Sequence, residues 1–329
     1  MCSQQHPAVM EVARKFRALE LHAARAGREV FETLVQVVLD SPARDSAALA
    51  TEIEQAVDAL LGAMPAYAPP LNAICRVSTL AEAGLRNGLP VQELKTAFNE
   101  ERNRFRLWSQ EAREKTALVG AELIRQGHKV FTFTFGETVM RVLSEAVGQG
   151  KAFRVRVTES SPNRDGVQTA SALAEIGVPV ELSIDACMAE LIAGCDLMLV
   201  GAEAITAVGS AVCKVGTYPA ALVARANNVP VYVVVDSSKF NLLSLYSIPL
   251  VLDHLRRQDV LPNNDRPDVQ VEGHLFDETP QTLISALVTE RGLMHPVAAA
   301  ALMRELPFSS HLFQKLSAWS LSKESLSVT

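Results

Sequence analysis

Residues 1–125 carry apolar side chains at helical spacing. In the stretches 6–40, 45–64 and 91–124, apolar residues recur every three or four positions with charged residues between them. Helices that bury one face have this pattern. Asp45 or Ser46 is suited to cap the helix that follows it, and three prolines interrupt the pattern in 65–84. We therefore predict a helical domain over residues 1–125.

The pattern changes after residue 125 to short runs rich in β-branched and aromatic residues. Helical stretches separate most of these runs, which span 129–135, 152–160, 178–184, 195–201 and 229–236. Alternation of strand and helix predicts βαβ units and a parallel sheet. We therefore predict an α/β domain over residues 126–329, in which the serine-rich tail after Pro307 adds a last helix.

The predicted sheet indicates where a ligand would bind, because parallel sheets bind ligands beyond the carboxyl ends of their strands. The segments at this edge are 134–138, 159–164, 201–217 and 236–240.

Composition excludes several classes of function. The net charge of −6 and the aromatic content of 5% argue against a broad nucleic-acid surface and against base stacking. The five cysteines are scattered without a CxxC pair, and the histidines lack metal-ligand spacing, so we expect reduced thiols and no metal site. No apolar run is long enough for a membrane helix, and the first residues do not resemble a signal peptide. We expect a cytoplasmic protein.

One candidate anion site lies in the run KVGTYPAALVARA. Gly216 permits a tight turn, and Thr217 is suited to cap the following helix, whose free amides attract anions. Lys214 before the turn and Lys239 after a later strand would add positive charge. The alternative is an ordinary helix cap with two surface lysines.

Acidic candidates follow two other strands. Glu203 lies in a Gly/Ala-rich loop, where a partly buried carboxylate can act as a base; the alternative is a solvated loop acid. In TESSPNRDG, turn chemistry explains the serines, proline, asparagine, aspartate and glycine. Only Glu159 and Arg164 then invite a functional interpretation.

The stretch 200–240, VGAEAITAVGSAVCKVGTYPAALVARANNVPVYVVVDSSKF, resembles the signature of the translation initiation factor 2B alpha/beta/delta family. That family includes methylthioribose-1-phosphate isomerase and ribose-1,5-bisphosphate isomerase. The likeness extends from GHKVFTF at residue 127 to FDETP and the following segment, ending at residue 292. It implies a helical N-terminal domain, a Rossmann-like domain and a dimer built on the C-terminal domain.

The sequence departs from the isomerase members at the positions that the resemblance implies are catalytic. Thr134, just before the ligand-site residue Gly136, stands at the position of the family's cysteine, and Glu203 at that of its aspartate. Ser161 replaces an arginine, whereas Lys214 is retained. A threonine hydroxyl ionises far less readily than a thiol, and a lost arginine removes a bidentate phosphate clamp.

These departures favour a protein that resembles the initiation factor 2B alpha subunit and binds a phosphorylated small molecule, a sugar phosphate or nucleotide, without isomerase chemistry. One alternative is an aldose–ketose isomerase acting on a sugar 1-phosphate. Glu203 would then be the base, and Thr134 or a water would replace the cysteine. Another is an assembly subunit with an empty pocket. All three imply a homodimer and no cofactor, with an initiation factor as a further possible partner. We also expect Thr134 to lie at the mouth of the pocket near Glu203.

Overall fold

The computed structural model describes residues 5–18, 20–64, 67–248, 250, 252–261, 268–309 and 312–319. The chain divides into two compact units, one made of residues 1–110, 238–251 and 302–329 and the other of residues 111–237 and 252–301. We refer to them as the helical unit and the sheet unit. The helical unit therefore also contains two segments from the C-terminal part of the chain, 238–251 and 302–329. The proposed pair of domains, 1–125 and 126–329, stays a prediction.

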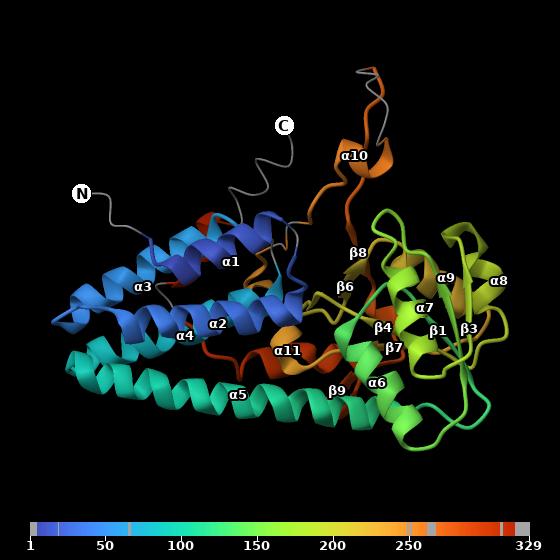
Figure 1. The fold of residues 1–329 in the computed structure, drawn as a ribbon, viewed down its shortest axis with the longest axis horizontal. Helices are drawn as coiled ribbons and strands as arrows, with labels where there is room; N and C mark the ends of the chain where they lie inside the picture. Colours follow the sequence, from blue (N-terminus) through green and yellow to red (C-terminus); the bar gives the residue numbers. More distant parts are fainter. Residues whose placement is uncertain are drawn as a thin grey trace. The chain divides into compact units, whose positions relative to one another are not determined.

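The helical unit is built from amphipathic helices (Figure 1). They are α1 (Pro7–Arg17), α2 (Ala23–Asp40), α3 (Ser46–Leu61), α4 (Ala68–Arg86) and the larger part of α5 (Val91–Ala121). α2 packs against α1, α3 and α4, and its Val30, Phe31 and Leu34 are fully buried. Residues 312–319 are helical, as we expected of the tail.

Local chemistry sets the ends of these helices. Asp45 caps α3, because its Oδ1 accepts a hydrogen bond from the Ala48 amide at 2.8 Å. The helix expected over 6–40 is two helices, α1 and α2. The expectation that prolines interrupt the helical pattern in 65–84 is wrong from residue 68 onward. Pro69 and Pro70 stand in the first turn of α4, where the missing amide hydrogen costs no helical bond.

The main sheet of the sheet unit has seven strands among the described residues, in the order β10-β9-β7-β4-β1-β2-β3. Its strands are β1 (Lys129–Thr132), β2 (Arg154–Thr158), β3 (Val180–Ser183), β4 (Leu197–Gly201), β7 (Val231–Val234), β9 (Ala286–Thr289) and β10 (Gly292–Met294). Neighbouring strands are parallel except β10, which is antiparallel to β9. The five predicted runs are confirmed as β1, β2, β3, β4 and β7, and the α/β fold class is confirmed with them.

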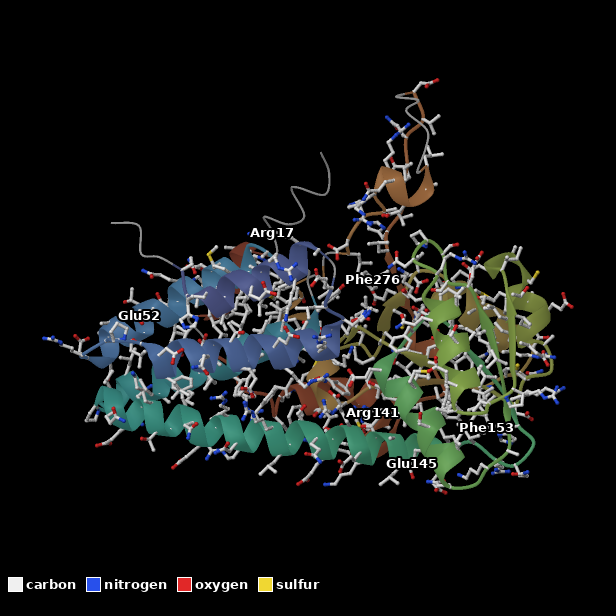
Figure 2. All side chains as sticks on the ribbon, viewed as in Figure 1. Arg17, Glu52, Arg141, Glu145, Phe153 and Phe276 are labelled. Carbon is white, nitrogen blue, oxygen red and sulfur yellow. The ribbon has the colours of Figure 1, made fainter. Side chains whose placement is uncertain are left out.

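Both faces of this sheet are covered, because consecutive strand residues such as Val130 and Phe131 are both fully buried. α6 (Glu137–Gly148) and α7 (Asp165–Glu175) contribute to one core cluster with the strands. Arg141 and Glu145 mark α6 in Figure 2. Two further helices between strands, α8 (Met188–Ile192) and α9 (Thr217–Ala226), pack against each other.

A second, antiparallel sheet that the sequence did not predict joins β5 (Ala204–Ile205), β6 (Ala211–Lys214) and β8 (Phe276–Thr279). Phe276 is labelled at the start of β8 in Figure 2. Before β8, His254 and His274 form an antiparallel bridge. We call the segment between these two residues, which contains α10 (Arg257–Val260), the arm. After β10, the short helix α11 spans Ala299–Met303.

Short 3-10 turns complete the chain at Asp185–Cys187, Ser237–Lys239, Leu242–Tyr246, Gln281–Leu283 and Pro296–Ala298. Among the described residues, none of the helices combines the length and the apolar character that crossing a bilayer requires.

Candidate functional site

The candidate site lies where the strand order of the main sheet reverses. The chain runs from β1 outward through β2 to β3, and from β4 outward through β7 to β9. β1 and β4 pair directly, with Thr132 opposite Leu199. Thr134 follows β1 and Glu203 follows β4, so both residues lie at the carboxyl ends of neighbouring strands. Open α/β sheets bind ligands in the crevice at this switch point.

The backbone at Thr134 is held in an unusual conformation. Its φ is 62°, in the left-handed region that a β-branched residue rarely adopts. The Thr169 hydroxyl on α7 donates to the Thr134 carbonyl at 2.8 Å. The Thr134 hydroxyl in turn donates to Asp165 Oδ2 at 3.3 Å. Strained residues held by their surroundings gather at functional sites.

Lys214, at the end of β6, interacts electrostatically with three acidic residues of the sheet unit. Its side chain is 8% exposed, and its Nζ lies 3.9 Å from Asp165 Oδ2. Burial lowers the pKa of Lys214, and the charges of Asp165, Asp259 and Glu203 oppose that shift. A buried ammonium among carboxylates can bind an anionic substrate or exchange a proton.

Glu203 is half-buried between β4 and β5. Its amide donates to the Val212 carbonyl at 2.7 Å, which fixes its backbone against β6. Its carboxylate acts electrostatically on Lys214. The structure therefore brings Glu203, Lys214 and Thr134 to one region through β4, β6 and the contacts of Asp165.

Glu159 and Arg164 form an ion pair after β2. Arg164 Nε lies 3.4 Å from Glu159 Oε2, and the arginine side chain is 66% exposed. Between them, the amides of Ser160 and Ser161 donate to the carboxylate of Asp185 at 2.9 and 2.8 Å. The loop is thus ordered by an acid from beyond β3, and Arg164 keeps the freedom to reach a ligand.

The start of α9 differs from the sequence-based expectation in one respect. Gly216 is the capping residue with φ 103°, and Thr217 begins the helix. A Cβ at Gly216 would lie 2.6 Å from Phe133 Cζ, so glycine is required there. The Thr217 hydroxyl does not cap the amides but donates to the Lys214 carbonyl at 2.7 Å.

Asp277 of β8 takes the capping role instead. Its Oδ2 accepts from the amides of Gly216 and Tyr218 at 2.7 and 3.0 Å. Burial raises the pKa of Asp277 to about 6, against the opposing effect of these backbone hydrogen bonds. Because a carboxylate already occupies this helix start, it offers less to an added anion than the sequence suggested.

The two other predicted ligand residues lie in different surroundings. Gly136 is the N-cap residue of α6, four residues after the end of β1. Lys239 belongs to the helical unit and is 6% exposed. Asn72 Nδ2 donates to the carbonyls on either side of it, those of Ser238 and Phe240, at 2.8 Å each.

Sequence reasoning missed several acids at the carboxyl edge. Besides Asp165, Asp185 and Asp277, Glu290 follows β9 and accepts from the Ser237 amide at 3.1 Å and from the Ser237 hydroxyl. Burial raises the pKa of Glu290. Asp165 and Asp185 follow predicted strands and could have been found by that signal, whereas β8 and β9 were not predicted.

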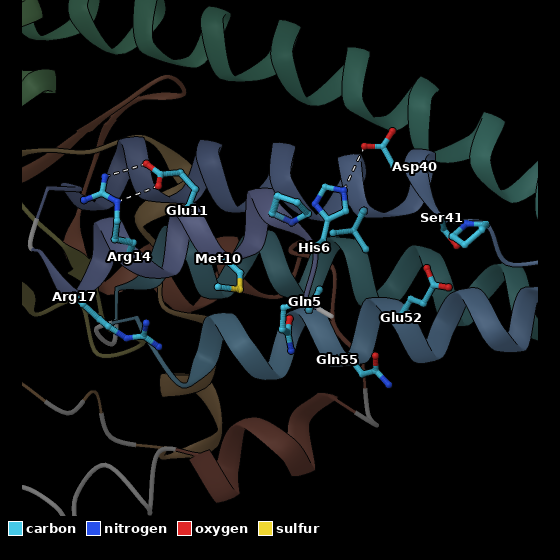
Figure 3. Close-up of a pocket in the computed structure, with 14 residues that line it drawn as sticks. Gln5, His6, Met10, Glu11, Arg14, Arg17, Asp40, Ser41, Glu52 and Gln55 are labelled. Carbon is cyan, nitrogen blue, oxygen red and sulfur yellow. Dashed lines mark hydrogen bonds and ion pairs between the residues drawn. The ribbon is translucent and has the colours of Figure 1, made fainter. Parts of the chain in front are cut away.

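A separate hollow of about 1070 Å³ lies in the helical unit between α1, α2 and α3 (Figure 3). Four of its polar and charged side chains pair with one another: His6 Nε2 lies 3.3 Å from Asp40 Oδ2, and Arg14 Nη2 lies 2.9 Å from Glu11 Oε1. None of the residues that the sequence singled out for function lines it. This hollow therefore carries no part of the candidate site.

Comparisons with known proteins place the chain among relatives of similar length. A model of the Initiation factor 2 subunit family matches residues 21–296. A ribose 1,5-bisphosphate isomerase of Archaeoglobus fulgidus is 30% identical over 299 residues, which cover 90% of this chain and 93% of the relative. The translation initiation factor eIF-2B structure from Pyrococcus horikoshii has a TM-score of 0.71 at 26% identity, covering 92% of this chain and 99% of that one.

A third comparison concerns the fold alone. The 5-methylthioribose 1-phosphate isomerase of Pyrococcus horikoshii has a TM-score of 0.72 at 22% identity, covering 91% of this chain and 87% of that one. Its match agrees with the α/β architecture described here.

The comparisons also correct the leading functional expectation. We expected a ligand-binding protein without isomerase chemistry, but the Archaeoglobus relative and five further archaeal relatives at 26–29% identity are ribose 1,5-bisphosphate isomerases. That expectation overweighted the substitutions at Thr134 and Glu203, although both new residues can still hold or exchange protons. The family itself is shown by the model match and by this relative. The chain belongs to the Initiation factor 2 subunit family.

Proposed function

We propose that the protein is an aldose–ketose isomerase acting on a sugar 1-phosphate, with ribose 1,5-bisphosphate as its substrate. The observation that carries the proposal is the meeting of Thr134, Asp165 and Lys214 at the switch point of the sheet, where Glu203 also acts on Lys214. The 30% identity to a ribose 1,5-bisphosphate isomerase supports this substrate.

The reaction moves protons without a net change in oxidation state. As the sugar ring opens, the C1–O4 bond breaks and O4 gains a proton. A base then removes the proton from C2, which gives an enol phosphate, and C1 receives a proton. The O2 hydroxyl loses its proton as the C2 carbonyl forms. Because the oxidation of C2 balances the reduction of C1, the chemistry needs no redox cofactor.

Glu203 is the base in this proposal. Its half-buried carboxylate follows β4 at the switch point, and a carboxylate in that setting suits transfer of the C2 proton to C1. The side chain of glutamate is one methylene longer than that of the aspartate implied by the family resemblance. The substrate therefore has to lie correspondingly farther from β4, since errors of about 1 Å can cost about 100-fold in rate.

Phosphate binding falls to cationic groups and a helix start at the same edge. Lys214 offers a buried charge and Arg164 an exposed one. Gly136 is the N-cap residue of α6, and the partial positive charge of a helix start favours an anion. The α9 start at Gly216 and Thr217 contributes less in this proposal, because Asp277 already accepts from its amides.

The test is direct turnover. Purified protein is incubated with ribose 1,5-bisphosphate, and formation of the ketose bisphosphate is followed by ³¹P and ¹³C NMR in D₂O. We expect conversion to the ketose bisphosphate, with deuterium at C1 to the extent that the proton taken from C2 exchanges with solvent while Glu203 carries it. 5-Methylthioribose 1-phosphate serves as the comparison substrate. Binding of ribose 1,5-bisphosphate without conversion would contradict the proposal.

The proposed assembly is a homodimer in the cytoplasm. The apolar run 297–306 does not supply a long helix for the dimer interface, because α11 spans only Ala299–Met303. Ala299 and Met303 are fully buried within the single chain, so they are not available to a partner. Support for assembly now comes from the family, in which the eIF2B-beta2-delta2 complex of Chaetomium thermophilum is tetrameric.

A further inference from the structure

Asp165 is a titratable side chain that the sequence did not select and that contacts two candidate site residues. Its Oδ2 accepts a hydrogen bond from the Thr134 hydroxyl at 3.3 Å, and the same oxygen lies 3.9 Å from Lys214 Nζ. The first distance is long for an O–H···O hydrogen bond. Such contacts often shorten when a substrate binds.

The protein fixes the position of this carboxylate closely. Asp165 is the first residue of α7, and the next residue, Gly166, lies so near the end of β2 that a Cβ would be 1.8 Å from the Thr158 carbonyl oxygen. Thr169, one turn along α7, binds the Thr134 carbonyl. The start of α7 is therefore tied to the ends of both β1 and β2, and Asp165 cannot move without them.

The isomerisation described above needs a second proton exchange that Glu203 does not perform. O4 gains a proton when the ring opens, and O2 loses one when the carbonyl forms. A threonine hydroxyl does not ionise near neutral pH, so Thr134 can relay such a proton but cannot store it. The group that exchanges this proton must titrate and must lie beside Thr134.

We propose that Asp165, with Lys214 as its proton store, exchanges the proton between O4 and O2 of the sugar. This inference rests on the proposed isomerase function. In the resting pair, the Lys214 ammonium holds the proton beside the Asp165 carboxylate. The proton passes through Asp165 to O4 as the C1–O4 electron pair moves onto O4. Later the O2–H proton returns through Asp165 to Lys214, so the pair ends as it began.

Two features of Lys214 suit it to this role. Its burial lowers its pKa from the ordinary value, which eases release of a proton. Its 8% exposure keeps bulk water from exchanging that proton freely. Lys214 can at the same time hold the substrate phosphate, so its removal affects both KM and kcat, whereas Asp165 is expected to affect kcat alone.

The test compares Asp165→Asn with the wild type and with Asp259→Asn. The asparagine side chain in the first variant can still accept the Thr134 hydrogen bond but cannot carry a proton. Asp259 also acts on the charge of Lys214, yet it is hydrogen-bonded to Arg256 on the arm. We expect Asp165→Asn to lower kcat about 100-fold or more with KM within about threefold. Asp259→Asn should lower kcat far less than Asp165→Asn and move the high-pH limb of the kcat profile to lower pH, because it removes one charge that holds the proton on Lys214. Thermal melts establish that each variant is folded.

The pH profile separates proton exchange from a structural role. Wild-type kcat should fall at high pH as Lys214 loses the proton that it stores, and the residual activity of Asp165→Asn should lack that limb. Asp165→Glu should recover part of the rate and the limb. An unchanged kcat in folded Asp165→Asn, a raised KM alone, or equal losses in Asp165→Asn and Asp259→Asn would overturn the role of Asp165. Absence of wild-type turnover would instead remove the proposed function, and this role with it.

Discussion

Single residues decide what chemistry the switch point can perform. The role of Glu203 as the base can be tested most directly. Glu203→Gln keeps the size of the side chain and removes its basicity. We expect kcat for ribose 1,5-bisphosphate to fall by about 100-fold or more while KM changes little, because general base catalysis contributes about 10²–10⁴-fold. Steady-state kinetics on the purified variant measures both constants. Retention of more than half of the wild-type kcat would exclude Glu203 as the base.

Gly216 supports the geometry around Lys214. Its φ of 103° and the 2.6 Å separation that a Cβ would have from Phe133 Cζ both forbid a side chain. We expect Gly216→Ala to lower the free energy of unfolding by about 1–3 kcal/mol, the usual cost of such strain. Gly148→Ala is the matched control, because Gly148 ends α6 with open space around its Cβ position. Urea unfolding should find that control unchanged or slightly stabilised, and equal stabilities of the two variants would contradict the argument.

The sequence located some site residues but not their partners. Glu203 was found because it follows a run of β-forming residues, and strand ends mark ligand sites in parallel sheets. Thr134, near the end of another such run, was found through the family resemblance. Asp165 contacts Thr134 across 31 residues, and Asp277 contacts Gly216 across 61. The run NRDG is typical of a turn, which accounted for Asp165 without a functional role. No local feature of the sequence therefore marked Asp165 as a site residue. Contacts of this kind are set by the packing of α7 and β8, which a local pattern does not encode.

At the scale of elements, the α9 cap predicts a dependence of stability on pH. Asp277 titrates near pH 6 in the folded protein and near 3.9 when unfolded. The folded state therefore binds more protons between these values, and stability falls as pH rises from about 4 to 6. Asp277→Asn can still accept from the Gly216 and Tyr218 amides without carrying a buried charge. We expect its stability relative to the wild type to increase from pH 4.5 to pH 7.5.

Asp277→Ala separates the contribution of the helix cap to stability from the contribution of the buried charge. It removes the acceptor as well, so we expect a loss of about 0.5–2 kcal/mol, the usual worth of a helix cap. Denaturant unfolding of both variants at the two pH values measures these effects. A stability difference between Asp277→Asn and the wild type that does not change with pH would show that Asp277 does not titrate in this range.

Elements in which apolar residues recur with a clear period were predicted well, whereas short elements were missed. α5, with 31 residues, and the five predicted β-rich runs of the main sheet have unmistakable patterns. β5 has two residues and β6 has four, lying in a Gly/Ala-rich loop without alternation. α4 was partly missed because its prolines signal interruption in a helix interior but are favoured in a first turn. Tertiary pairing defines such elements more than their own residues do.

At the scale of the whole molecule, assembly is the open prediction. We expect a dimer, so light scattering at micromolar concentration should give about twice the chain mass of 35.6 kDa. A mass equal to one chain across the accessible concentration range would contradict the dimer. It would leave the catalytic proposal intact, since Thr134, Asp165, Glu203 and Lys214 all belong to the sheet unit of one chain.

The central claim is that this chain catalyses isomerisation despite carrying threonine and glutamate at the positions that the family resemblance implies are catalytic. Turnover of ribose 1,5-bisphosphate by the wild type, followed by NMR in D₂O, tests it most directly. We predict conversion of ribose 1,5-bisphosphate to the ketose bisphosphate by the wild type, and loss of that conversion in Glu203→Gln. Persistence of unchanged ribose 1,5-bisphosphate at enzyme concentrations that saturate its binding would contradict the claim.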